Sequence, residues 1–147
     1  MQARVLVRRV GPVLVPLPTY QSAEAAGVDL RAALESAVVL APGERKLIPT
    51  GIALQIPVGF EGQVRPRSGL ALKSGISVVN SPGTIDSDYR GEVGIVLINH
   101  GSLSFSVEPL ARIAQLVIAP VVQARFEFSE RLDTTERGSG GYGSTGG

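Results

Sequence analysis

Short apolar runs rich in valine and isoleucine recur along the chain, with proline, glycine and asparagine between them. They cover residues 5–7, 13–17, 37–40, 47–48, 52–56, 76–79, 93–98, 103–107 and 113–122. Strong turn signals separate several of the runs, because proline presets φ and glycine tolerates positive φ. They are found at residues 41–44, 57–59 and 81–83. Short strands at this spacing predict an all-β sandwich or barrel.

Helical patterns are short. Residues 68–75 begin with Ser68, a residue type that caps helices, and end with Gly75, so they predict one or two helical turns. Residues 23–26 are a second candidate for a single helical turn.

The C-terminal stretch differs from the rest of the chain. Six of the ten residues from 138 to 147 are glycine, so this stretch cannot bury a core and is expected to be mobile. We therefore interpret residues 1–125 as one folded domain and residues 126–147 as a flexible arm.

Composition narrows the classes of function. The chain has 147 residues, of which 44% are hydrophobic and 18% charged, and its net charge is +1. This near-balance argues against a nucleic-acid coat. Cysteine is absent and His100 is the only histidine, so thiolate chemistry and multi-histidine metal sites are excluded. No apolar run approaches the ~20 residues of a membrane span, and no secretory signal is evident. We expect a soluble, cytoplasmic protein without nucleic-acid or membrane partners.

Residues 83–92 (GTIDSDYRGE) follow a Pro-Gly turn and precede an apolar run, which predicts a hairpin. In an extended segment, alternation would place Asp86 and Asp88 on one face and Tyr89 on the other. A carboxylate can take a proton from water, and a tyrosine ring can support a sugar or base. Taken alone, the segment fits an ordinary acidic loop better.

Three further segments carry polar groups with two interpretations each. Arg67 and Ser68 lie at the start of the predicted helix. They form either an anion site or a plain helix start beside a surface arginine. Asp29 lies among small and apolar residues, where an acid is most often a turn or cap residue. Gln115 opens a long apolar strand, where a structural amide is the commoner role.

Residues 137–146 (RGSGGYGSTG) offer glycine amides, hydroxyls and an arginine to a polyphosphate. The segment superficially resembles a P-loop but fits one poorly, because Ser144 stands where the lysine belongs and no βαβ strand precedes it. Composition alone favours a plain tail, although Tyr142 is unusual in a mere spacer.

The order of these segments is specific. AGVDLRA, PRSGLALK, NSPGTIDSDYRGE, RIAQLVI and RGSGGYGSTG resemble, in sequence order, the five motifs of the homotrimeric dUTPase family. They extend from Ala26 to Gly146. The resemblance implies a distorted antiparallel jelly-roll-like barrel with one short helix, which assembles as a trimer with shared sites. It also implies Mg²⁺-assisted hydrolysis of dUTP to dUMP and pyrophosphate, which limits uracil in DNA and supplies dUMP for thymidylate synthesis.

The resemblance also implies roles for single residues. Asp86 would be the general base, Tyr89 would pack beneath the deoxyribose, and Asp29 would hold Mg²⁺ through water. The implied substrate-binding set is Arg67, Ser68, Gly69, Asn80, Gly83, Thr84, Asp86, Tyr89, Gly94, Gln115, Arg137, Tyr142, Gly143, Ser144 and Thr145.

Two positions depart from the family pattern. Tyr142 stands where phenylalanine is usual, and Ala111 stands where an acid often precedes the arginine of the fourth motif. The ring face survives in tyrosine, so we expect stacking on uracil to be kept. Two alternatives remain open: a bifunctional dCTP deaminase–dUTPase on the same fold, and a non-catalytic nucleotide-binding module.

Overall fold

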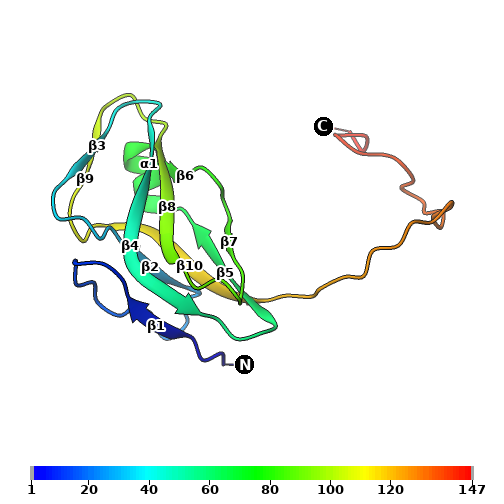
Figure 1. The fold of residues 1–147 in the computed structure, drawn as a ribbon. Coiled ribbons are helices and arrows are strands. Elements are labelled where there is room, and N and C mark those ends of the chain that lie inside the picture. The colour runs from blue at the N-terminus through cyan, green and yellow to red at the C-terminus, as the bar shows by residue number, and fades with distance from the viewer. Residues whose placement is uncertain (1, 147) are drawn as a thin grey trace.

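The chain folds into antiparallel sheets with one short helix, which confirms the predicted fold class (Figure 1). The computed structural model describes residues 2–146, and Met1 and Gly147 lie outside the described part. The strands within it are β1 (Leu6–Arg9), β2 (Gly27–Arg31), β3 (Val38–Leu40), β4 (Arg45–Gln55), β5 (Phe60–Arg65), β6 (Ile76–Val78), β7 (Gly83–Ile85), β8 (Glu92–Asn99), β9 (Phe105–Val107) and β10 (Arg112–Pro120). The helix α1 spans Ser68–Ser74.

The strands form two four-stranded sheets and one two-stranded sheet. The first sheet has the order β1-β4-β8-β6, the second β2-β10-β5-β7, and β3 pairs with β9. The strand pairs within all three are antiparallel. Neighbours in a sheet are mostly distant in sequence, so residues of separate motifs come to adjacent positions.

One hydrophobic cluster, drawn from both large sheets, forms the core. Strand β8 shows the pattern: Val93, Ile95 and Leu97 are buried, whereas Gly94 between them is exposed. This period-2 alternation is that of a strand with one face in the core. The core residues with at most 1% exposure are Leu30, Ala32, Leu40, Ile48, Ile76, Ile95, Leu97, Val107 and Ala114.

Some predicted elements are wrong. Residues 13–17 form no strand, because Pro16 lacks a backbone N–H and Pro12 and Pro18 flank the run. Residues 23–26 contain only a turn. The strands β2 and β5 were not anticipated, since polar residues and glycines interrupt their apolar positions.

Helix α1 was predicted correctly, but its start differs in detail. Ser68 is its first helical residue, and Arg67, in an extended conformation without a side-chain cap, is the N-cap. Gly75 ends the helix with φ 67°, a left-handed conformation that glycine adopts without a Cβ penalty.

The predicted hairpin over residues 83–92 is also wrong. Strand β7 pairs with β5 and strand β8 pairs with β4 and β6, so the segment crosses from one large sheet to the other. Residues 86–91 between the strands form a turn, in which the Tyr89 N–H donates to the Asp86 carbonyl at 3.1 Å. The alternation of faces expected for an extended segment therefore does not apply.

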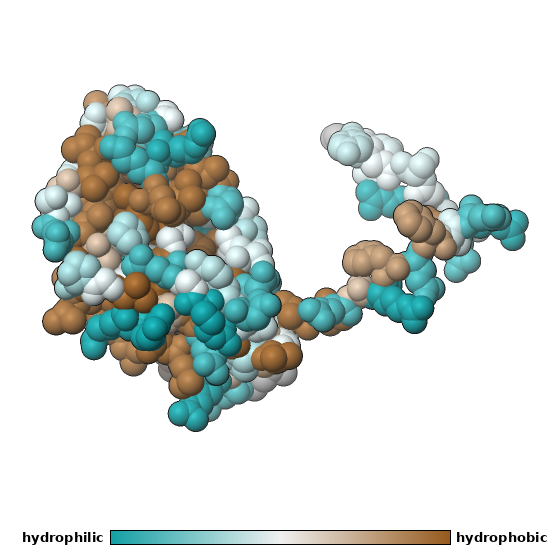
Figure 2. Space-filling view, in the orientation of Figure 1, coloured by the Kyte–Doolittle hydropathy of each residue, from teal (hydrophilic) through white to brown (hydrophobic). Residues whose placement is uncertain are grey.

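The C-terminal segment leaves the barrel after β10 and extends away from it (Figure 1). Residues 121–139 are exposed throughout, and the space-filling view shows this segment apart from the barrel (Figure 2). The Val121 N–H still donates to the Gly59 carbonyl at 2.9 Å. Among the described residues, no helix is long and apolar enough to cross a membrane.

Candidate functional site

A pocket of about 210 Å³ opens where the chain crosses between the two large sheets. Its floor comes from core strands, through Val64 of β5, Val78 of β6 and Val93 of β8. Its polar rim contains six residues of the predicted site: Asn80, Gly83, Thr84, Asp86, Tyr89 and Gly94. The crossover thus gathers residues that a simple hairpin would not have placed against β5.

Gly83 packs closely against Asn80. A Cβ built there would lie 3.3 Å from Asn80 Nδ2 and 3.3 Å from the Asn80 carbonyl oxygen. Gly83 is buried, so its missing side chain lets the amide of Asn80 approach the strand backbone. Backbone groups and one amide therefore meet at this end of the pocket, a set suited to the polar edge of a planar base.

The turn after β7 carries Asp86 and Tyr89. The Tyr89 hydroxyl donates to the Glu92 carbonyl at 3.0 Å, which fixes the ring at the pocket rim with 47% of the residue exposed. A Cβ at Gly91 would collide with the Tyr89 hydroxyl, so the glycine leaves room for the ring in this position. Asp86 is exposed, and its carboxylate lies beside the pocket in contact with solvent.

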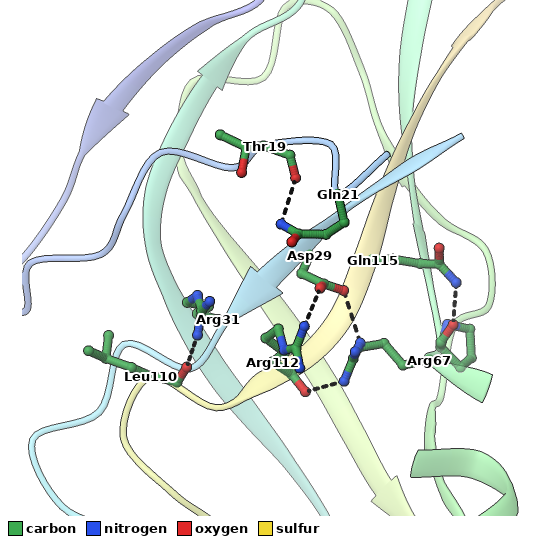
Figure 3. A network of polar contacts seen from close by, with 9 residues as sticks. Thr19, Gln21, Asp29, Arg31, Arg67, Leu110, Arg112 and Gln115 are labelled. Carbon is green, nitrogen blue, oxygen red and sulfur yellow. Dashed lines mark hydrogen bonds and ion pairs between the residues drawn. The ribbon is translucent and has the colours of Figure 1, made fainter. Parts of the chain in front are cut away.

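A second cluster surrounds Asp29 on β2 (Figure 3). Arg67 Nε lies 2.9 Å from Asp29 Oδ1, and Arg112 Nη1 lies 3.4 Å from Asp29 Oδ2. Only 19% of the Asp29 side chain is exposed, against 27% for Arg67 and 47% for Arg112. One carboxylate therefore sits between two cations, which leaves a net positive charge next to the start of α1.

Gln115 joins this cluster from β10, directly opposite Asp29 in the strand register. Its Nε2 donates to the Pro66 carbonyl at 2.9 Å, just before Arg67. A Cβ on Gly27 would lie 2.7 Å from Gln115 Oε1, so glycine leaves room for this amide. Ser68 and Gly69 follow at the exposed first turn of α1.

The remaining predicted residues lie in the arm, away from both clusters. Arg137 Nε donates to the Gly140 carbonyl at 2.8 Å, and the Ser144 N–H donates to the Gly141 carbonyl at 3.1 Å. Tyr142 is fully exposed, with a positive φ of 51°. These bonds join near neighbours in sequence, so the arm holds only local turns.

The structure thus divides the predicted residues into three groups. The pocket lining does not include Asp29, Arg67 or Gln115, nor any arm residue. Sequence reasoning assigned no role to Arg112 or to Gly91. Both lie inside quoted motifs, and only the contacts of Arg112 with Asp29 and of Gly91 with Tyr89 reveal their importance.

Residues 14–146 match the family profile described as dUTPase, and this match covers nearly the whole chain. The chain belongs to the dUTPase family. Several members of this family are close to it in sequence. The chain is 60% identical over 134 residues to the deoxyuridine 5'-triphosphate nucleotidohydrolase of Roseobacter denitrificans, covering 90% of this chain and 88% of the relative. It is 59% identical to that of an Anaeromyxobacter species, with 99% of each chain covered.

Solved dUTPase structures have a similar fold. A mutant dUTPase of Staphylococcus bacteriophage 80alpha with dUpNHpp aligns with a TM-score of 0.87 and 27% identity, covering 97% of this chain and 98% of that one. A mutant dUTPase of phage phi11 of S. aureus, described with a structural Mg(II) ion, aligns with a TM-score of 0.77 and 25% identity, covering 87% and 97%.

Proposed function

We propose that this protein hydrolyses dUTP to dUMP and pyrophosphate, and so limits uracil in DNA and supplies dUMP for thymidylate synthesis. The observation that carries the proposal is the pocket between the two sheets, which gathers Asn80, Asp86 and Tyr89. The pocket has a volume of about 210 Å³.

The base and sugar occupy this pocket. Asn80 and the backbone near Gly83 and Gly94 contact uracil, and Thr84 lines the same rim. Tyr89 packs beneath the deoxyribose and leaves no room for a 2'-hydroxyl. The bond from its hydroxyl to the Glu92 carbonyl supports this role, because it holds the ring in place before substrate arrives.

Asp86 acts as the general base. It takes a proton from a water molecule, whose oxygen attacks the α-phosphorus while pyrophosphate departs on the opposite side. Two features support this assignment: the Asp86 carboxylate is solvent-exposed, and it stands at the rim of the pocket.

The phosphates bind Arg67, Ser68, Gly69 and Gln115. Arg67 uses Nε for Asp29 and Nη1 for the Arg112 carbonyl at 3.3 Å, so Nη2 keeps both of its N–H donors. A guanidinium held at Nε and Nη1 presents Nη2 to phosphate oxygens with little loss of entropy.

Mg²⁺ fits this site only through water. Among residues 2–146, no group of three acidic or histidine side chains could hold a metal ion directly. Asp29 already binds two arginines, but a carboxylate has about four acceptor positions and can also accept from metal-bound water. Such a mode suits an ion that keeps several waters and binds substrate phosphates. When bound, Mg²⁺ supplies charge neutralisation to the triphosphate.

The arm completes the site of a neighbouring copy in a homotrimer. Arg137, Gly143, Ser144 and Thr145 reach the γ-phosphate side, and Tyr142 covers the uracil. Exposed apolar side chains nearer the barrel support a docked arm, since large apolar groups in solvent normally mark a contact surface. Val122, Phe126, Phe128 and Leu132 are each at least 87% exposed.

Nucleotide binding must offset the cost of ordering this arm. Fixing one residue costs ~1–2 kcal/mol, so fixing ten costs on the order of 10 kcal/mol. Stacking by Tyr142 contributes only about 1–3 kcal/mol. Charge-assisted bonds to the triphosphate are therefore required, and the arm loosens once pyrophosphate has left.

A panel of dUTP, dTTP, dCTP and UTP, each with and without Mg²⁺, tests the function. We expect pyrophosphate release from dUTP but not from the other three nucleotides. With dUTP, the release should be faster when Mg²⁺ is present. Ammonia release from dCTP would instead identify a bifunctional deaminase. Binding of dUTP without any turnover would identify a non-catalytic module.

A further inference from the structure

Arg112 meets Oδ2 of the Asp29 carboxylate, whereas Arg67 meets Oδ1 (Figure 3). We propose that Arg112 is a positioning residue for dUTP hydrolysis: it holds Asp29 Oδ2, so that Asp29 Oδ1 keeps the Arg67 guanidinium turned toward the triphosphate. The inference rests on the function proposed above, and it concerns a side chain that this function does not use.

A β-bulge places Arg112 in this position. Arg112 pairs with Arg31, Ala114 with Leu30 and Gln115 with Asp29, so β10 contains one extra residue at Ile113. In a regular strand, residues three apart face opposite sides, and Arg112 would lie on the other face from Gln115. The bulge turns both Ile113 and Ala114 into the core, with 2% and 0% exposure. Arg112 thereby joins the polar face, a re-aiming of side chains that bulges produce.

Three contacts form a closed loop. Arg67 contacts Asp29 through Nε, Asp29 contacts Arg112 through Oδ2, and the Arg112 carbonyl accepts from Arg67 Nη1 at 3.3 Å. The last contact belongs to the backbone and survives any substitution of the Arg112 side chain. Such a substitution therefore removes only the ion pair with Asp29, through which the Arg112 side chain orients Arg67.

A double-mutant cycle tests this chain of contacts. Arg112→Ala, Asp29→Asn and the double variant are each assayed for kcat and KM with dUTP. Arg112→Ala should lower kcat/KM about fivefold, the scale of one partly exposed ion pair, and Arg112→Lys should recover part of the loss. In the Asp29→Asn background, the same Arg112→Ala change should have almost no effect, because the group through which it acts is gone.

Ligand binding separates positioning from damage to the fold. Arg112→Ala should weaken binding of dUpNHpp, whose phosphates need Arg67. It should leave deoxyuridine binding unchanged, because the pocket around Asn80 and Tyr89 lies outside this cluster. Arg31→Ala is the matched control. It removes the arginine opposite Arg112, whose Nη1 donates to the Leu110 carbonyl at 3.0 Å, and should show no coupling to Asp29→Asn.

Three results would overturn the proposal. Equal losses from Arg112→Ala with and without Asp29→Asn would mean that Arg112 acts independently, for example by touching the phosphates itself. Weakened deoxyuridine binding would mean general damage to the fold. A folded wild-type protein that leaves dUTP intact would refute the proposed function, and this role with it, whereas an active wild type with an additive cycle would refute this role alone.

Discussion

Tyr89 in the barrel and Tyr142 in the arm are both exposed tyrosines assigned to the same nucleotide, but their surroundings differ. The Tyr89 hydroxyl is bonded to the Glu92 carbonyl, and its ring borders a pocket lined by core strands. Tyr142 lies between Gly141 and Gly143, with its whole surface exposed. The ring of Tyr89 is therefore held in place before any ligand binds, whereas the arm around Tyr142 becomes ordered only when it binds a ligand.

Backbone conformation repeats this contrast. Among the described residues, Leu110 and Tyr142 are the two non-glycine residues with positive φ, at 59° and 51°. Leu110 is held at the end of β2, because its N–H donates to the Ala32 carbonyl at 2.8 Å and its own carbonyl accepts from Arg31. Tyr142 has only local turns around it. Strain in the barrel is maintained by tertiary contacts, and strain in the arm is free to relax.

The largest expected effect lies in the preformed pocket. Asp86→Asn should still bind dUTP but lower kcat by about 10²–10⁴-fold, because the amide cannot take the proton of the attacking water. Asp88→Asn is the matched control, since Asp88 lies in the same turn but not in the pocket lining. Steady-state kinetics of both variants measures these effects. Near-normal turnover of Asp86→Asn would show that Asp86 is not the general base.

Removal of the arm tip should separate activity from stability. A chain ending at Glu136 should lose about 10²–10³-fold in kcat/KM, the scale found when groups that stabilise transition-state charge are removed. Its melting temperature should stay within about 2 °C of the full chain, because residues 137–146 contribute no buried side chain. Calorimetry beside the assay checks both. A large fall in melting temperature would mean that the tip belongs to the folded barrel.

The ring of Tyr142, not its hydroxyl, should matter for activity. Tyr142→Phe should stay within about twofold of wild type, whereas Tyr142→Ala should lose about tenfold in kcat/KM through lost stacking on uracil. A comparison of the two variants with dUTP decides between ring and hydroxyl. Equal activity of all three proteins would show that the residue does not cover the base.

The smallest effect concerns stability alone. Leu110→Gly should raise the free energy of unfolding by about 0.5 kcal/mol, because relief of a left-handed conformation slightly exceeds the added entropy of the unfolded chain. Tyr142→Gly should leave it unchanged, since the arm unfolds at no cost. Urea denaturation at one fixed protein concentration measures both. A destabilised Leu110→Gly would mean that packing of the leucine outweighs its strain.

The sequence predicted those elements whose pattern is local. Strand β8 and the end of α1 at Gly75 were anticipated because apolar alternation and a terminal glycine act within a few residues. Strand β5 was missed because only Gly62 and Val64 of its six residues are buried, which leaves no apolar run. The crossover at residues 86–91 could not be foreseen, because the pairing of β7 with β5 joins segments about twenty residues apart.

The candidate site shows the same limit. The five motifs indicated which residues belong together, but not that Arg112 would contact Asp29. That contact depends on the register of β2 against β10 and on the bulge at Ile113, neither of which leaves a periodic signal in the sequence. The grouping into a pocket, an arginine cluster and an arm likewise comes from strand order.

Hydrogen–deuterium exchange of residues 138–146 tests most directly whether the triphosphate orders the arm. The exchange is measured in three states: the free protein, the protein with dUMP and the protein with dUpNHpp. The account predicts fast exchange in the free protein and with dUMP, and marked slowing with dUpNHpp, while amides of the barrel strands stay protected in all three states. Equal exchange of the arm with and without dUpNHpp would contradict it.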